Sequence, residues 1–122
     1  MAEVMNREVV VRVFDLIGTS LAVSSDDGQR VYDKIAPLLR QGQKVRLSFD
    51  KIDTIISAFL NAAVGQLYGE FSEDKVRDLF NVQEMSPEDL ALLKRVVDNA
   101  KLYFENRKEF DQAWRDEVGG PQ

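Results

Sequence analysis

The first half of the chain combines short apolar stretches with one helical pattern. Residues Glu8–Phe14 are rich in β-branched side chains and predict a strand, and their near-continuous apolarity favours a strand covered on both faces. A short second extended piece is expected within Thr19–Val23. Residues 24–27 (Ser-Ser-Asp-Asp) are typical of a helix N-terminus. That helix is expected to run to about Arg40, with a kink or an early break at Pro37.

The pattern then changes from a strand to a second helix. Residues Lys44–Phe49 alternate polar and apolar side chains, as a half-buried strand does. From position 56 onward, apolar residues recur every three or four positions, which predicts one helix with a broad stripe facing the core. The residues of the stripe are Ile56, Phe59, Leu60, Ala63, Val64, Leu67, Tyr68 and Phe71. A short strand is expected at Asp78–Val82.

A long helix is predicted at the end of the chain. Ser86 can cap it, Pro87 suits its first turn, and Asp89 occupies the position of the reciprocal cap partner. An apolar seam then follows, formed by Leu90, Leu93, Val97, Ala100 and Phe104. Helical character is expected to persist to Glu117.

The length of this last helix leaves two alternatives for its C-terminal part. At about 1.5 Å per residue the unbroken helix would span roughly 45 Å, which exceeds the width of a domain of this size. In the first alternative the helix breaks near Asn106, and Phe110 and Trp114 pack on the domain's own core. In the second the helix projects, and the two aromatic residues face a partner.

Strands and helices therefore alternate along the chain. Such alternation predicts an α/β fold with parallel strand pairing across the helical crossovers. We expect one domain over residues 1–122, with a small mixed sheet of about four strands, three or more helices and a long C-terminal helix. Residues 1–7 and 118–122 are expected to be flexible ends.

The residue composition argues against catalysis and against a metal site. The chain has no cysteine, which excludes disulfides and thiolate chemistry. It also has no histidine, which removes the commonest general base near neutral pH and the commonest metal ligand. The acidic residues Glu70, Glu73 and Asp74 lack the spacing of a Ca²⁺-binding loop. We therefore expect a protein that is not an enzyme and that carries no metal ion or cofactor.

Charge and hydropathy limit the compartment and the partners. The chain contains 16 Lys and Arg against 21 Asp and Glu, a net charge of −5, which gives no basic footprint for nucleic acid. No apolar stretch approaches the ~20 residues that cross a bilayer. Residues 1–7 lack the apolar core of a secretory signal. We expect a cytoplasmic protein that binds neither nucleic acid nor membrane.

The segment from Lys44 to Leu67 resembles a known family. It contains an apolar strand (VRLSF, 45–49), an acidic turn (Asp50–Asp53) and the sequence SAFLNA (57–62) at the start of a helix. This order is similar to the core of STAS domains. It is still more similar to a family of small bacterial STAS-like proteins of unknown function. In that family a strand ending in a Phe-Asp pair leads to a Ser/Thr-rich turn and a Phe at the helix start.

The resemblance implies a fold and a mode of action. STAS domains are α/β, and the best-known members are anti-sigma factor antagonists that bind protein partners. A kinase-like ATPase phosphorylates a serine at the start of their second main helix and thereby switches partner binding. Other STAS domains are regulatory parts of anion transporters or sensors, and some bind nucleotides.

The corresponding switch position in this chain lies at the start of the second main helix. The family motif, an Asp followed by two serines and a glycine, aligns with Ile56-Ser57-Ala58-Phe59. The column of the modified serine is Ala58 and that of the acid is Ile56, so Ser57 is the best hydroxyl and Thr54 the next. The N–H groups and macrodipole at a helix start accommodate a phosphate. The alternative for Ser57 is an ordinary helix-capping residue.

The expected partner surface follows from this alignment and from the aromatic residues of the last helix. For Asp50 and Asp53 the alternative is a local role as turn residues. The residues of the expected surface are Asp50, Asp53, Ser57, Asn61, Phe110 and Trp114.

We therefore expect a non-enzymatic, regulatory protein–protein interaction module, with phosphorylation at the start of the second main helix as its switch. Its expected partner is a kinase-like ATPase or another regulator, and a homodimer is compatible with the sequence. The alternative function is a small-molecule or nucleotide-binding sensor domain.

Overall fold

The computed structural model describes the backbone of residues 8–114 and the side chains of residues 8–107. The expected flexible ends and the expected end of the last helix at Glu117 lie outside the described residues. The elements are β1 (Glu8–Arg12), α2 (Val13–Ile17), β2 (Leu21–Ala22), α3 (Ser25–Arg40), β3 (Lys44–Ser48), β4 (Thr54–Ile55), α4 (Ser57–Leu60), the π-helical turn η1 (Asn61–Gly65), α5 (Leu67–Glu70), α6 (Glu73–Leu79), β5 (Phe80–Gln83) and α7 (Pro87–Trp114).

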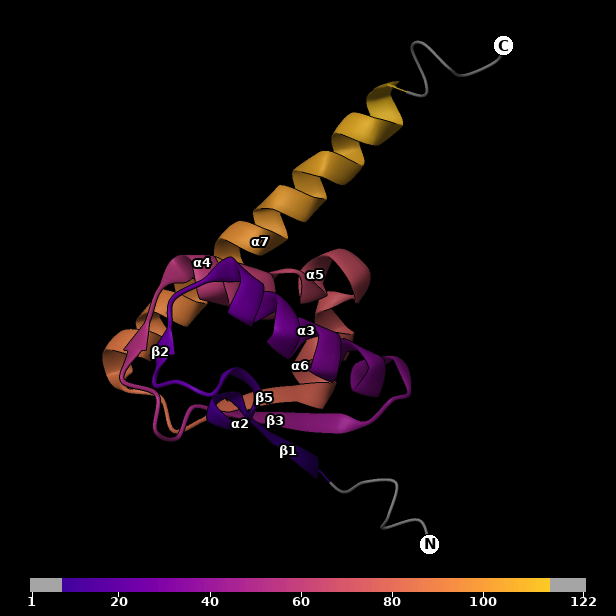
Figure 1. The fold of residues 1–122 in the computed structure, drawn as a ribbon. Coiled ribbons are helices and arrows are strands. Elements are labelled where there is room, and N and C mark those ends of the chain that lie inside the picture. Colours follow the sequence, from indigo (N-terminus) through magenta and orange to yellow (C-terminus); the bar gives the residue numbers. More distant parts are fainter. Residues whose placement is uncertain (1–7, 115–122) are drawn as a thin grey trace, which may run out of the picture.

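The main sheet has the order β1-β3-β5 (Figure 1). All described strand pairs are parallel, because the chain passes through helices between paired strands and returns in the same direction. Val45 pairs with Val9 on one side and Phe80 on the other, and Leu47 pairs in the same way with Val11 and Val82. The α/β class, the small sheet and the long C-terminal helix are confirmed. A mixed sheet, with both parallel and antiparallel pairs, was expected, but within residues 8–114 no strand pair is antiparallel.

The first strand is shorter than predicted, and one of its faces is open. β1 ends at Arg12, and the next residues form the short helix α2, which Gly18 closes with a left-handed backbone (φ 73°). The expected strand to Phe14 and the expected cover on both faces are therefore wrong. Val10 is 52% exposed, and Glu8 forms an ion pair with Arg46 across the open face. The helices bury the other face of the sheet.

Helix α3 runs without a break through Pro37 to Arg40. The predicted early break is therefore wrong. Proline removes only one N–H donor, and in the last turn of a helix this loss interrupts few bonds. Ser24 caps the helix as expected, accepting a hydrogen bond of 3.1 Å from the N–H of Asp27.

The second main helix is divided into α4, η1 and α5. The π-helical turn inserts one residue into the helical repeat. The single α-helix predicted from position 56 is therefore interrupted by this turn. Most of the predicted stripe is nevertheless buried: Phe59, Leu60, Ala63, Val64 and Leu67 are at most 1% exposed. These residues belong to the hydrophobic core, and the helix that carries them packs against α3 and α7. The first stripe residue, Ile56, is 40% exposed and lies outside the core.

The segment before β5 is helical, which corrects the predicted strand at Asp78–Val82. Ser72 caps α6 through the N–H of Lys75 at 3.1 Å, and α6 extends to Leu79. The strand starts only at Phe80. Val76 is 2% exposed and Leu79 is partly buried, the spacing of a short helix facing the core.

Helix α7 is continuous to Trp114 and leaves the body of the domain (Figure 1). The N–H of Asp89 donates to the Ser86 hydroxyl at 3.1 Å, so the expected cap is confirmed. The helix does not break near Asn106, and its C-terminal part projects. Leu102 and Tyr103 are each 57% exposed at the point where it leaves the body.

Candidate interaction surface

A two-stranded parallel sheet, separate from the main sheet, carries the segment that was predicted as the site. β2 pairs with β4 in the register Leu21 with Thr54 and Ala22 with Ile55. The pairing continues beyond the strands, because the N–H of Ile56 donates to the carbonyl of Ala22 at 3.1 Å. Successive side chains of a strand point to opposite faces. Ala22 (0% exposed) and Ile55 (7%) occupy the face that is buried in the core.

The opposite face of this small sheet is apolar and exposed. Leu21 is 47% exposed, Val23 39% and Ile56 40%, and Thr54 is also exposed. Leu21 pairs with Thr54, and the register places Val23 opposite Ile56. We call these four residues the β2–β4 face. They bring together two segments that lie about thirty residues apart in the chain.

Leu21 and Val23 are not among the residues of the predicted surface. A signal was present in the sequence, because the alternation in residues 20–24 (SLAVS) puts both on one side of an extended segment. Alternation alone does not say which side of a strand is buried. The buried position of Ala22 between them settles this.

Ser57 directly follows the β2–β4 face. Ile56, with an extended backbone, is the N-cap of α4 and provides no side-chain cap, so Ser57 is the first helical residue and not the capping residue. The Ser57 side chain is exposed, as is that of Asn61 one helical turn later. Residues four apart on a helix share a face. The structure therefore places Ser57 and Asn61 on one face of this helix, but Asn61 lines a small hollow with Tyr103 and Phe104 of α7, away from β4.

The two aspartates of the predicted site have different surroundings. Asp50 accepts a hydrogen bond of 3.1 Å from Nη2 of Arg12, and its N–H donates to the hydroxyl of the buried Ser48. These contacts tie Asp50 to the end of the main sheet. Asp53 is exposed and immediately precedes β4, and its N–H donates to the carbonyl of Ser20 at 2.8 Å. Only Asp53 adjoins the β2–β4 face.

The two aromatic residues of the predicted surface are in α7. The side chains of Phe110 and Trp114 lie outside the described part of the chain, so their placement at a partner surface stays a prediction.

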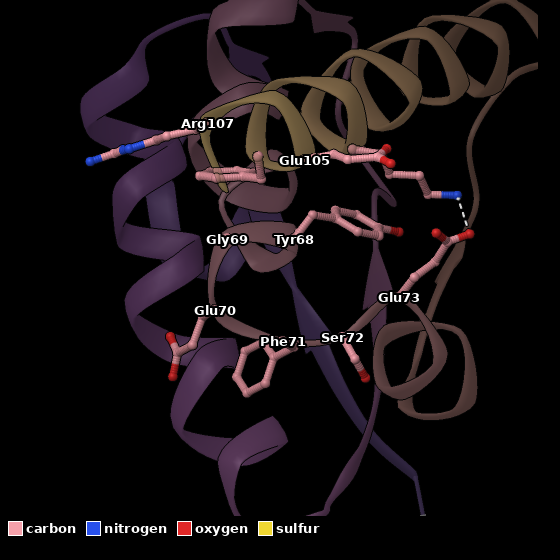
Figure 2. A pocket seen from close by; sticks show the side chains of 10 residues that line it. Tyr68, Gly69, Glu70, Phe71, Ser72, Glu73, Glu105 and Arg107 are labelled. Atoms are coloured by element: carbon pink, nitrogen blue, oxygen red, sulfur yellow. Dashed lines mark hydrogen bonds and ion pairs between the residues drawn. The ribbon is translucent and has the colours of Figure 1, made fainter. Parts of the chain in front are cut away.

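A second feature is a hollow of about 770 Å³ between the turn at residues 68–73 and α7 (Figure 2). The rings of Tyr68, Phe71 and Phe104 line it, together with charged groups that include Arg107. A Cβ atom at Gly69 would lie 2.5 Å from the Phe104 ring, so the glycine allows this ring to pack against the turn. The sequence pattern predicts these aromatic residues only as members of apolar helix faces.

Hydrogen bonds and ion pairs hold the acidic side chains at this hollow in place. Glu70 accepts hydrogen bonds from Arg40 and, at 2.6 Å, from the Tyr32 hydroxyl, and these bonds lower the pKa of Glu70 to about 2. Burial and the neighbouring Glu70 carboxylate raise the pKa of Tyr32 to about 12. Glu73 is paired with Lys101 at 3.0 Å (Figure 2). In the described residues, no group of three or more carboxylates is placed to hold a metal ion.

Comparison with known proteins gives one match. The model of the STAS-like domain of unknown function (DUF4325) matches residues 27–90, just over half of the chain. No curated protein and no solved structure matches. None of the helices within residues 8–114 is long and apolar enough to cross a membrane. The matched range contains β3, β4, α4 and β5, which include the segment that carried the resemblance. The chain belongs to the family of STAS-like domains of unknown function (DUF4325).

Proposed function

We propose that this STAS-like domain is a non-enzymatic regulatory module that binds a protein partner through the β2–β4 face. The observation that carries the proposal is the exposed row of Leu21, Val23 and Ile56. Contiguous exposed apolar side chains are unfavourable in water and mark interaction sites. These three side chains are not needed to fill the core, because Ala22 and Ile55 do so from the other face of the same strands.

The residue types support a binding role over a catalytic one. The chain has neither histidine nor cysteine, and the polar groups on or next to the β2–β4 face include the hydroxyls of Thr54 and Ser57 and the carboxylate of Asp53. Hydroxyl and carboxylate groups can bind a partner, and a hydroxyl can be modified by one. Without histidine, the commonest general base near neutral pH is missing.

Ser57 is proposed as the control point of this surface. Its hydroxyl is exposed at the first helical position, next to Ile56. A phosphate there would add about −1.5 to −2 charges. It would keep its hydration shell beside Ile56 and so hinder a partner from covering that side chain. A kinase-like ATPase is the proposed modifying partner.

The proposal predicts that Ile56→Asp abolishes partner binding. The substitution places a charge in the centre of the contact, where it would have to be desolvated. Affinity capture of the tagged protein from its native host, with quantitative mass spectrometry, measures the retained partner. We expect at least a tenfold loss with Ile56→Asp, a severalfold loss with Ser57→Asp and retention with Ser57→Ala.

Leu102→Asp provides the matched control. Leu102 is also an exposed apolar residue, but it belongs to α7 and not to the β2–β4 face. Its variant should retain the partner at the level of the unchanged protein. If Ile56→Asp retained every partner that the unchanged protein retains, the proposed function would be wrong.

The hollow at α7 favours one second candidate, a small-molecule or nucleotide sensor. Its aromatic rings can stack on a base, and Arg107 can pair with a phosphate. On this hypothesis ATP, GTP or a related nucleotide raises the melting temperature by a few degrees at saturating concentration. A thermal-shift panel on the unchanged protein and on Arg107→Ala checks this. The hypothesis fails if no nucleotide shifts the unchanged protein, or if the shift persists in the variant.

A further inference from the structure

We infer that the partner segment bound by the β2–β4 face is apolar in its middle and carries Lys or Arg at both ends. This inference rests on the proposed function, because it describes the partner of the same surface. The inference is carried by the charges around the face. The apolar side chains alone do not say which charges the ends of the partner segment carry.

The two segments that build the β2–β4 face and its surroundings contain only acidic charges, and the basic residues Arg12, Arg30 and Lys51 stand directly outside their ends. Residues 13–29 form α2, β2 and the start of α3, and residues 52–69 form β4, α4, η1 and most of α5. Together they contain four aspartates and no Lys or Arg, a charge of −4, in a chain whose net charge is −5. The four residues are Asp15, Asp26, Asp27 and Asp53.

Two of these aspartates lie at opposite ends of the small sheet. Asp53 immediately precedes Thr54, at the start of β4. Asp26 lies in the first turn of α3, three residues after Val23, where the chain leaves the face. Both side chains are exposed. The apolar row therefore has one carboxylate before it and one after it along the direction of the strands.

These two carboxylates are not neutralised within the described part of the chain. The other two aspartates, Asp15 and Asp27, lie near arginines, at 3.9 Å from Arg12 and 4.0 Å from Arg30. Asp26 and Asp53 have no described cation within ion-pair distance. Their field therefore acts on whatever approaches the face.

Electrostatic complementarity then selects the partner. Charges at the rim of an interface stay hydrated, so they guide association and reject like charges without a large desolvation cost. A segment with acidic ends would be repelled by Asp26 and Asp53 together. A segment with basic ends would be attracted at both, while its apolar middle covers Leu21, Val23 and Ile56. The phosphate proposed at Ser57 acts on this apolar middle, because its hydration shell keeps the partner from covering Ile56.

Two synthetic peptides test this inference with methyl-detected NMR titrations of the full chain. Both have the same short Val- and Leu-rich middle, and one has two Lys at each end where the other has two Glu. We expect the Lys-ended peptide to shift the methyl signals of Leu21, Val23 and Ile56, with a weaker effect as salt shortens the range of the field. The Glu-ended peptide should leave these signals unchanged.

Variants identify the responsible charges. The double variant Asp26→Asn/Asp53→Asn should bind the Lys-ended peptide roughly threefold to tenfold more weakly at low salt. Glu105→Gln, which removes an exposed carboxylate from α7, should not change the binding. The same spectra show that each variant is folded.

The possible failures separate this inference from the proposed function. Equal shifts with both peptides, shifts at other methyl groups, or unchanged binding by the double variant would each overturn the basic partner. None of these results would change the outcome of the affinity capture, in which retention of the partner depends on Ile56. Loss of that dependence would instead remove the docking face itself.

Discussion

Gly28→Ala is expected to destabilise the domain by about 3 kcal/mol or more. A Cβ atom at this position would lie 2.4 Å from the carbonyl oxygen of Phe59 and 2.8 Å from the Cβ of Ala62. The first of these atoms belongs to the backbone of the second main helix, so it cannot move away as a flexible side chain would. The two helices would have to separate, and the core between them would loosen. Urea denaturation of the variant measures the loss.

Gly65→Ala is the matched control for Gly28→Ala. Gly65 is also a buried glycine of the second main helix, but it faces α7, and the nearest atoms to its added Cβ, in Ala100 and Asn61, would lie 3.6 Å away, an ordinary contact distance. Replacing glycine by alanine at an unstrained helical position stabilises a protein by about 0.4–1 kcal/mol. We expect a neutral or slightly stabilising effect. If both variants lost the same stability, the close approach of α3 to the second main helix would not explain Gly28.

Phe59→Ala is expected to cost about 3–5 kcal/mol, because it leaves a cavity in the core. Phe59 is 0% exposed and is among the largest fully buried side chains. In a domain whose total stability is of the order of 5–15 kcal/mol, this loss is severe. Thermal and urea denaturation measure it. Phe59→Leu should cost less, about 1–2 kcal/mol, and keeps the effect measurable if the alanine variant does not fold.

The neighbouring Ile56→Ala gives the opposite expectation. Ile56 is 40% exposed, so its removal should change the free energy of unfolding by less than about 1 kcal/mol. Phe59 and Ile56 are three residues apart and both belong to the predicted apolar stripe. A large stability loss with Ile56→Ala would mean that this side chain serves the core, and the β2–β4 face would lose one of its members.

The two residues also separate folding from binding. Phe59 holds the start of the second main helix in the core, and Ile56 remains on the surface as its extended cap residue. A variant that loses the partner but keeps its stability, as expected for Ile56→Asp, can therefore be assigned to the interface. A variant at Phe59 cannot.

The sequence by itself determined the order of elements wherever local chemistry was sufficient. The change from period two to period three or four marked β3 and the second main helix, and the Ser24 and Ser86 caps marked the starts of α3 and α7. Helices between the strands made parallel pairing the expected outcome. The pattern from Lys44 to Leu67 placed the chain near the family to which it belongs, and it located Ser57 at a helix start.

Only the tertiary structure decided which side of each apolar segment meets the core. Ile56 fits the helical stripe in sequence but caps the helix from an extended position, and Leu21 and Val23 point outward because Ala22 fills the inner side. Phe80 begins a strand where Asp78 still belongs to a helix, because the pairing of β5 with β3 starts only there. The hollow at α7 depends on Gly69 meeting Phe104, thirty-five residues away in sequence. These features arise from contacts between distant segments, whose packing decides the outcome when local patterns permit more than one.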